Sequence, residues 1–392
     1  MGKYNFDKLI DRKGTYASKW ENMPGIDSPD GLPLWVADMD FPCSDDIIKA
    51  VHERVDRLIF GYTIYDNADL KSAVTGWYKK RYDWNVKAED VFYCPGVVPA
   101  FTFLCLALTG EGDGIIIQPP VYHPFRMGIE AIKRTVANSP LIYNKADACY
   151  TMDFDDLDKK FADPNNKGMI LCHPHNPVGR VWTEEELKKV VAIAKKHGKW
   201  IISDEIHADI VRKHINFKPL VMYAGDYVDE IMTLTAPSKA FNMAGLKMSN
   251  LVITKKEYQD KYTDMAAKQL HVTGVSPLAI AATIAAYTKS EDWLNEMNDY
   301  VDANVAYAME FFKKELPKAN PINIEGTYLF WVDLSAYGTQ EELDEAIKKK
   351  ARVAFNTGGM FGEGGEGFQR INVACPRSIL VEALDRIKEA LA

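Results

Sequence analysis

Between residues 90 and 255 the chain alternates short apolar runs with longer amphipathic stretches. The apolar runs fall at residues 90–94, 114–118, 168–172, 199–205, 231–234 and 251–254. Residues 99–108 are helix-like, and residues 183–198 carry apolar side chains at helical intervals, with Thr183 and Glu186 in capping-box spacing and Gly198 at the end. Buried strands that alternate with helices are typical of a parallel sheet covered by helices. The pattern therefore predicts an α/β fold.

The pattern changes after about residue 290. It predicts a long helix at roughly 293–316, strands at 327–334 and 368–374, and a closing helix at 378–392. These elements form a smaller α/β unit, which we expect the N-terminal arm to join. We place the arm and part of the small domain at 1–45, a large domain at 46–288, and the C-terminal small domain at 289–392. A chain of 392 residues is long enough for both domains.

Composition and charge exclude several classes of partner. The net charge of −8 and the lack of a basic run argue against nucleic acid and anionic membrane surfaces. No apolar run approaches the roughly 20 residues that span a bilayer, and the start of the chain lacks the apolar core of a signal peptide. The six cysteines are scattered without a CxxC pair, as in proteins with reduced cytosolic thiols. We expect a cytoplasmic protein.

Residues 362–367, GEGGEG, match the G-x-G-x-x-G pattern of dinucleotide-binding loops. That pattern binds a pyrophosphate only where it follows a strand and opens a helix. Here the glycines lead into the predicted strand at 368–374, and Glu363 and Glu366 would repel a phosphate. We interpret the segment as a loop.

Reactive side chains follow the predicted strands, at the edge where open parallel sheets bind their ligands. After the first strand a helix opens at Gly96, Val97 and Val98, and N–H groups at a helix N-terminus suit a phosphate. Later strands are followed by Tyr122, Asn176, Asp204, His207, Ser238 and Lys239. Singly, each has an ordinary explanation as a core aromatic, turn residue, core histidine, ion-pair partner or surface lysine. The histidines of HPH at 173–175 lack converging carboxylate or cysteine support, so we expect no metal site.

Together these residue types predict a pyridoxal phosphate site. Lys239 can bond covalently to the cofactor aldehyde and, once released, act as a base. Asp204 can keep the pyridine nitrogen protonated, so that the ring accepts electrons from the substrate. Tyr122 can stack on the ring, and Asn176 can donate a hydrogen bond to its phenolic oxygen.

Four further residues complete the predicted site. His207 lies where it could assist Asn176 at the ring, while Ser238 and Lys247 can contact the phosphate. Arg370, in the small domain, can bind a substrate α-carboxylate through two parallel hydrogen bonds. We therefore expect a small amino-acid substrate held between the two domains.

Longer motifs carry a resemblance to a known family. NPVGRVW (176–182), DEIHAD (204–209) and SKAFNMAGL (238–246) resemble fold-type I pyridoxal phosphate enzymes of the aspartate aminotransferase superfamily. Six further motifs resemble, more narrowly, the MalY/PatB branch of cystathionine β-lyases: WVADMDF (35–41), FGY (60–62), PGVVPAF (95–101), PVYHPF (120–125), EGTYL (325–329) and RINVACPR (370–377). The resemblance runs from about residue 30 to the C-terminus. It implies a large domain with a mostly parallel seven-stranded sheet and a smaller α/β domain.

The resemblance also implies roles and an assembly. It makes Lys239 the cofactor-binding lysine, and it implies a homodimer in which Tyr62 reaches the phosphate in the neighbouring subunit. The chain departs from its relatives at His207, where they commonly carry tyrosine, at Lys247, where they commonly carry arginine, and at His173, which replaces an asparagine often found in this branch.

The activity that we expect is a carbon–sulfur β-lyase. Such an enzyme would cleave L-cystathionine or a related cysteine S-conjugate to pyruvate, ammonia and a thiol. The alternative is a class I/II aminotransferase, which shares every step up to removal of the α-proton. A lesser alternative is a regulatory or binding protein that retained the fold. The intact Lys239, Asp204 and Arg370 argue against this last alternative.

Overall fold

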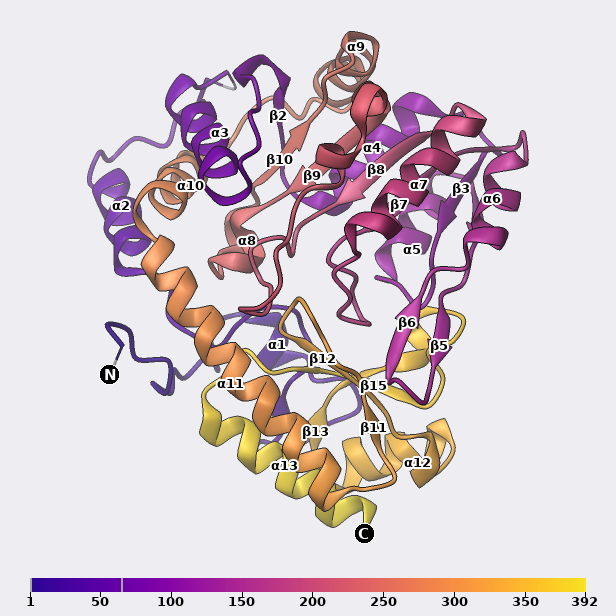
Figure 1. Cartoon of the computed structure of the whole chain (residues 1–392). Coiled ribbons are helices and arrows are strands. Elements are labelled where there is room, and N and C mark those ends of the chain that lie inside the picture. The colour runs from indigo at the N-terminus through magenta and orange to yellow at the C-terminus, as the bar shows by residue number, and fades with distance from the viewer. Residues whose placement is uncertain (1, 65) are drawn as a thin grey trace.

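The computed structural model describes residues 2–64 and 66–392. Its largest sheet contains β2 (Val91–Cys94), β3 (Gly114–Ile117), β4 (Thr135–Asn138), β7 (Asn166–Cys172), β8 (Trp200–Asp204), β9 (Ile231–Thr235) and β10 (Ser249–Val252). The strand order is β2-β10-β9-β8-β7-β3-β4 (Figure 1). β10 runs antiparallel to both of its neighbours, and the other pairs are parallel. The mostly parallel seven-stranded sheet that the resemblance implies is confirmed.

Helices cover both faces of this sheet because successive residues of a strand point to opposite faces. In β3, Ile115 and Ile117 belong to one apolar cluster, whereas Ile116 belongs to another. Helices of the first cluster are α4 (Val97–Leu108), α5 (Pro124–Ala131) and α9 (Lys256–Thr263). Helices of the second are α6 (Phe154–Ala162) and α7 (Glu184–His197). This double cover explains why the strands are apolar throughout.

The bounds of α7 follow from its capping residues, as the sequence predicts. The Thr183 hydroxyl accepts a hydrogen bond from the Glu186 N–H, and the Glu186 carboxylate accepts one from the Thr183 N–H. Gly198 ends the helix in the left-handed region, with φ of 63°.

A second, four-stranded sheet lies in the lower part of Figure 1. It is antiparallel, in the order β11-β12-β15-β14, with β11 (Asn320–Pro321), β12 (Leu329–Asp333), β14 (Asn356–Thr357) and β15 (Phe368–Asn372). The long α11 (Glu291–Glu315) and the closing α13 (Arg377–Leu391) run beside it (Figure 1). The predicted long helix, two strands and closing helix are therefore present. The glycines of residues 362–367 lead into β15, without an intervening helix.

The N-terminal arm joins the second sheet region. β1 (Leu32–Pro33) pairs in parallel with β13 (Val353–Ala354), and α1 (Ser18–Glu21) lies nearby in the lower part of Figure 1. Four further helices and a hairpin of two strands lie before α11: α2 (Asp45–Val55), α3 (Ala68–Tyr82), α8 (Pro237–Ala240), α10 (Pro277–Lys289), and the paired β5 (Ile142–Asn144) and β6 (Cys149–Thr151). A short α12 (Gln340–Asp344) precedes β13. The domain boundaries at 45/46 and 288/289 remain a prediction.

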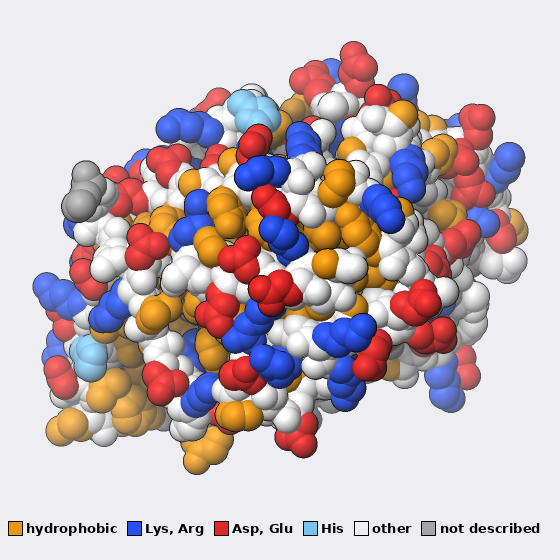
Figure 2. Space-filling view, turned by 90° about the horizontal axis from the view of Figure 1, so that it is seen from below, with side chains coloured by type: hydrophobic (Ala, Val, Ile, Leu, Met, Phe, Trp, Pro, Cys, Tyr) orange, Lys and Arg blue, Asp and Glu red, His pale blue; other side chains and the backbone are white. Residues whose placement is uncertain are grey.

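Charged side chains of both signs are mixed on the face shown in Figure 2, without a continuous basic patch on that face. Within the described ranges, no helix is long and apolar enough to cross a membrane.

Candidate active site

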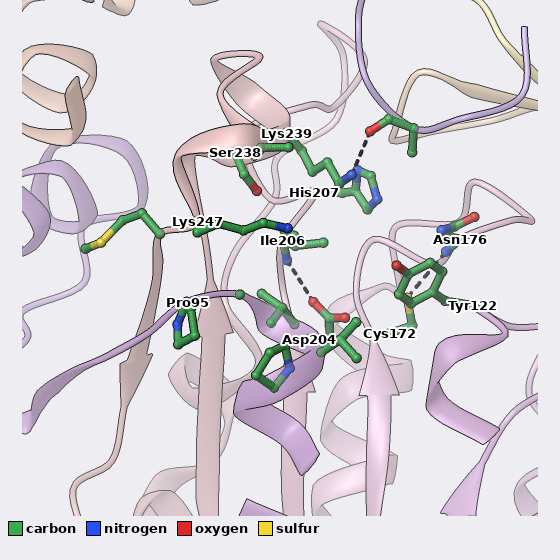
Figure 3. Close-up of a pocket in the computed structure, with 17 residues that line it drawn as sticks. Pro95, Tyr122, Cys172, Asn176, Asp204, Ile206, His207, Ser238, Lys239 and Lys247 are labelled. Carbon is green, nitrogen blue, oxygen red and sulfur yellow. Dashed lines mark hydrogen bonds between the residues drawn. The ribbon is translucent and has the colours of Figure 1, made fainter. Parts of the chain in front are cut away.

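A cavity of about 420 Å³ lies at the carboxyl end of the parallel strands (Figure 3). Its walls come from the start of α4, the ends of β7 and β8, and the segment that begins at α8. Every predicted site residue except Tyr62 and Arg370 lines it: Gly96, Val97, Val98, Tyr122, Asn176, Asp204, His207, Ser238, Lys239 and Lys247. Residues far apart in sequence thus meet where the strand-end argument places them.

Lys239 lies on α8, directly after the buried strand β9. Its Nζ donates a hydrogen bond of 2.6 Å to the backbone oxygen of Ala37, which belongs to the N-terminal part of the chain. Burial lowers the pKa of Lys239 to about 8; the charge of Asp38 opposes this shift and that of Arg370 adds to it. A lysine with such a pKa is partly uncharged near neutral pH and can act as a nucleophile or base.

Asp204 is the last residue of β8 and is 2% exposed. Its Oδ1 accepts a hydrogen bond from the Ile206 N–H. Burial raises the pKa of Asp204 to about 7, although this hydrogen bond and the charge of Lys239 oppose the shift. A buried carboxyl with so few partners is suited to a ligand group that carries a proton or positive charge.

The other end of the cavity is suited to an anion. α4 begins there with Gly96 as its N-cap, which offers no side chain to the first N–H groups of the helix. Ser238 and Lys247 line the same cavity, and Figure 3 shows the Lys247 amine directed into it. Free N–H groups at a helix N-terminus, a hydroxyl and an ammonium together form a phosphate-binding set.

Tyr122, Asn176 and His207 complete the wall. Burial raises the pKa of Tyr122 to about 12, so its ring is an uncharged surface at neutral pH. Burial lowers the pKa of His207 to about 3, and its buried Nδ1 has no hydrogen-bond partner. The imidazole is therefore neutral, and its Nδ1 is available for a hydrogen bond to a ligand in the cavity.

Arg370 stands just behind this wall. It lies on β15, is 4% exposed, and donates from Nη1 to Asn176 Oδ1 at 2.9 Å. Its Nη2 donates to Asn356 Oδ1 at 2.5 Å and to the Trp35 backbone oxygen at 3.0 Å. Burial lowers the pKa of Arg370 to about 10, which still leaves it charged at neutral pH. Asn176 thus joins the cavity to a buried cation on the second sheet.

Tyr62 is not part of the cavity of its own chain. Its side chain is fully exposed, in an irregular segment that also exposes Leu58, Ile59, Phe60 and Ile64. A cluster of exposed apolar side chains is typical of an interaction surface.

The sequence reasoning missed two contacts. The Ala37 oxygen, which receives the Lys239 amine, lies inside WVADMDF, a motif that was given no role. Asn356, which holds Arg370, also received none. The motif WVADMDF, which carries part of the family resemblance, could have indicated a role for Ala37. No motif could have indicated Asn356, because only the tertiary structure brings it to Arg370.

The family model for aminotransferase class I and II matches residues 29–387. The chain belongs to this family. A similar curated relative of this family is cystathionine β-lyase PatB of Bacillus subtilis (strain 168), 39% identical over 390 residues, which cover 99% of this chain and 100% of the relative.

Two solved structures of the aminotransferase class I and II fold are also similar over nearly the whole chain. A pyridoxal phosphate-bound putative aminotransferase of Clostridium difficile 630 is 40% identical, with a TM-score of 0.96 over 99% of this chain and 100% of its own. A pyridoxal phosphate-bound C–S lyase of Staphylococcus hominis, in complex with L-cycloserine, is 38% identical, with a TM-score of 0.93 over 99% and 98%. In the described part of this family member, no group of three or more His, Cys, Asp or Glu side chains could hold a metal ion.

Proposed function

We propose that this chain is a pyridoxal phosphate-dependent carbon–sulfur β-lyase that acts on L-cystathionine or related cysteine S-conjugates. The observation that carries the proposal is the meeting of the low-pKa Lys239 and the buried Asp204 in one cavity. Relatives named cystathionine β-lyase and C–S lyase, similar over their full lengths, support this chemistry over transamination. The products are pyruvate, ammonia and a thiol.

The residues present fit the cofactor at both of its ends. The helix α4 N-terminus, Ser238 and Lys247 suit the phosphate, while Asp204 suits a protonated pyridine nitrogen. Asn176 Oδ1 is engaged by Arg370, which leaves its Nδ2 as the donor for the ring oxygen. The unsatisfied His207 Nδ1 lies in the same wall. Tyr122 provides the stacking surface.

When bound, the cofactor supplies an electron sink for the substrate's α-carbon. Lys239 would hold the cofactor through its Nζ and, once the substrate amine has released it, would take up the α-proton on the same atom. Asp204 would hold a proton at the ring nitrogen. The elimination itself requires a leaving group on the β-carbon, and a thiolate meets that requirement.

Arg370 orients the substrate by binding its α-carboxylate. Two of its nitrogens are already fixed by Asn176, Asn356 and Trp35, so the guanidinium is held in place before substrate arrives. Because the group is buried and charged, a carboxylate partner is strongly favoured over water.

The active assembly that we propose is a cytoplasmic homodimer. The exposed apolar segment around Tyr62 supports it, since a second copy of the chain would cover these side chains. Tyr62 would then reach the phosphate in the neighbouring subunit. No role for nucleic acid, membrane or metal enters this proposal.

L-Cystathionine distinguishes the lyase from an aminotransferase. Both remove the α-proton, but only the lyase expels a thiol and regenerates its cofactor without a second substrate. Purified protein should release pyruvate and thiol in equal amounts over many turnovers with no keto acid added. Pyruvate is measured with a coupled dehydrogenase and thiol with a disulfide reagent.

Two variants test the proposed roles of Lys239 and Arg370 in the same assay. Lys239→Ala should abolish turnover, and Arg370→Ala should lower kcat/KM by roughly ten- to a few hundred-fold, the cost of about 1.5–3 kcal/mol for a charge-assisted contact. Strict dependence on an added keto acid, without thiol release, would establish an aminotransferase instead.

A further inference from the structure

A second cavity, of about 290 Å³, adjoins the first and shares Tyr122 with it. One wall is the start of α5, with His123, Arg126 and Met127. The other is the 3₁₀ turn at Gly358–Phe361. The two walls are joined by a hydrogen bond of 2.9 Å from the Val121 N–H to the Phe361 oxygen. None of the proposed cofactor contacts other than Tyr122 lines this space.

The second cavity lies within reach of a substrate held at Arg370. The Arg370 guanidinium carbon lies 4.8 Å from the centre of the Phe361 ring, and Phe361 lines the second cavity. Tyr122, on which the cofactor ring would stack, lines both cavities. A substrate with its carboxylate at Arg370 and its α-carbon over Tyr122 can therefore extend its side chain into this space.

The side chains that line the second cavity are mostly apolar, and Arg126 is the cation among them. Val121, Met127, Met360 and Phe361 provide apolar and thioether surface, and among the described residues no Asp or Glu lines the cavity. Met127 is 61% exposed and Met360 41%, so the cavity opens to solvent.

Arg126 supplies the charge. Its Nη1 donates to Glu130 at 3.1 Å and its Nη2 to Asn138 at 3.0 Å, which fix the guanidinium and leave other N–H donors for a ligand. His123 adds no charge, since burial and the nearby Arg370 lower its pKa to about 4. Its buried Nδ1 has no hydrogen-bond partner.

We propose that this second cavity binds the group that leaves with sulfur, and that Arg126 selects leaving groups ending in a carboxylate over those ending in an amine. The proposal deepens the β-lyase function and rests on it. A flexible apolar chain fits the methionine and phenylalanine surface. A terminal ammonium would be placed beside the Arg126 guanidinium, and the Glu130 carboxylate next to it is already paired with that guanidinium.

Three cysteine S-conjugates of similar length test the selectivity: S-(2-carboxyethyl)-, S-propyl- and S-(2-aminoethyl)-L-cysteine. They share the α-carboxylate, α-amine and scissile bond, so kcat/KM for pyruvate release differs only through the leaving group. We expect the carboxyethyl conjugate to be the best substrate and the aminoethyl conjugate the poorest. Equal values for these two charged conjugates would overturn the proposal.

Arg126→Gln removes the charge and keeps an amide that can still bond Asn138. It should reduce the ratio of carboxyethyl to aminoethyl kcat/KM by roughly three- to tenfold, because the Arg126 side chain is 41% exposed and solvent weakens its interaction with a charged leaving group. Arg126→Lys should restore most of the ratio. An unchanged ratio in Arg126→Gln would show that another group makes the selection.

β-Chloro-L-alanine separates failure of this proposal from failure of the lyase function. Its leaving group is a single atom that does not reach the second cavity, so all Arg126 variants should turn it over equally. If the wild-type protein released no pyruvate from it, the lyase function itself would fall, and the selectivity proposal with it.

Filling the cavity gives an independent test. Gly359 lines it, and a Cβ added there meets no heavy atom within 4 Å. Gly359→Leu should lower kcat/KM for all three long conjugates by roughly tenfold or more while β-chloro-L-alanine turnover stays within about twofold. Parallel losses on every substrate would contradict a leaving-group cavity, as would no loss on any of them.

Discussion

At the scale of single residues, burial prepares the site before any ligand arrives. It moves the pKa values of Lys239 and Asp204 toward each other, to about 8 and about 7, because each charged form loses its hydration. Coulomb attraction between the two opposes both shifts without cancelling them. The cavity thus contains a lysine that is partly uncharged near neutral pH and a carboxyl whose raised pKa fits the proposed contact with a protonated ring nitrogen.

This predicts how the cofactor-free protein takes up pyridoxal phosphate as pH changes. Only the uncharged amine attacks the aldehyde, and burial lowers the lysine pKa, so the uncharged form appears at lower pH than in a solvated lysine. The rate of covalent attachment, followed by absorbance, should rise steeply as pH passes through about 8 and then level off. Peptide mapping after borohydride reduction should place the label on Lys239. A rate that continues to rise to pH 10 would refute the buried-amine account.

At the scale of elements, the N-terminal arm holds one side of the site. Residues 35–41 follow β1, and Lys239 donates to Ala37 within them. Fully buried Lys19 pairs with Asp40 at 2.6 Å, while Asn372 and Asn242 donate to backbone oxygens of the segment. This segment therefore depends on buried polar contacts from three separate elements.

Asp40→Asn tests that dependence. The substitution removes the negative charge that pairs with the buried Lys19 ammonium and with Arg12, and it puts an N–H donor in place of one carboxylate oxygen, so the free energy of unfolding should fall by about 2–4 kcal/mol. Chemical denaturation monitored by tryptophan fluorescence measures this change. As a matched control, Asp226→Asn breaks an exposed pair with Lys195 and should leave stability nearly unchanged. Equal effects of the two substitutions would show that the buried pair is not a structural anchor.

The sequence predicts where the helices and strands lie better than it predicts which strands pair and which distant residues come into contact. The alternation of apolar runs predicted six of the seven strands of the large sheet, and the capping box predicted α7, because both signals are local. It missed the edge strand β4, whose side chains are only partly buried and form no apolar run. The antiparallel β10 and the pairing of β1 with β13 depend on long-range packing. For the same reason the strand-end side chains were predicted, whereas Ala37 and Asn356 were not: a backbone oxygen and a distant amide leave no local pattern.

At the scale of the whole molecule, the site draws on both sheets. Lys239 and Asp204 follow strands of the seven-stranded sheet, whereas Arg370 lies on the four-stranded one. Arg212 strengthens the connection, with Nη1 2.9 Å from the Asp302 carboxylate on α11 and Nη2 bonded to the Thr327 oxygen. In the proposed dimer, Tyr62 would add a contact from a second chain to the same site.

The dimer proposal predicts complementation between two defective variants. Lys239→Ala lacks the reactive amine, and Tyr62→Ala lacks the residue that we expect to cross the interface. Co-refolded or co-expressed, the pair should regain activity that neither shows alone, because a mixed dimer contains one intact site. Activity is measured as pyruvate release, with size-exclusion chromatography to establish the dimer. Independent, purely additive activities would show that Tyr62 does not complete the site of the neighbouring subunit.

The hydrogen bond between Arg370 and Asn176 connects the two proposed ligands, the cofactor and the substrate carboxylate, through one amide group. An amide has one oxygen and one nitrogen on a rigid plane, so the orientation that gives its oxygen to Arg370 also gives its nitrogen to the cavity. A ligand that fixes the orientation of the amide nitrogen therefore also fixes the orientation of the amide oxygen, and the reverse holds as well. Cofactor and substrate carboxylate should therefore strengthen each other's binding by the same factor, and a protein without cofactor should be a poor receptor for amino acids.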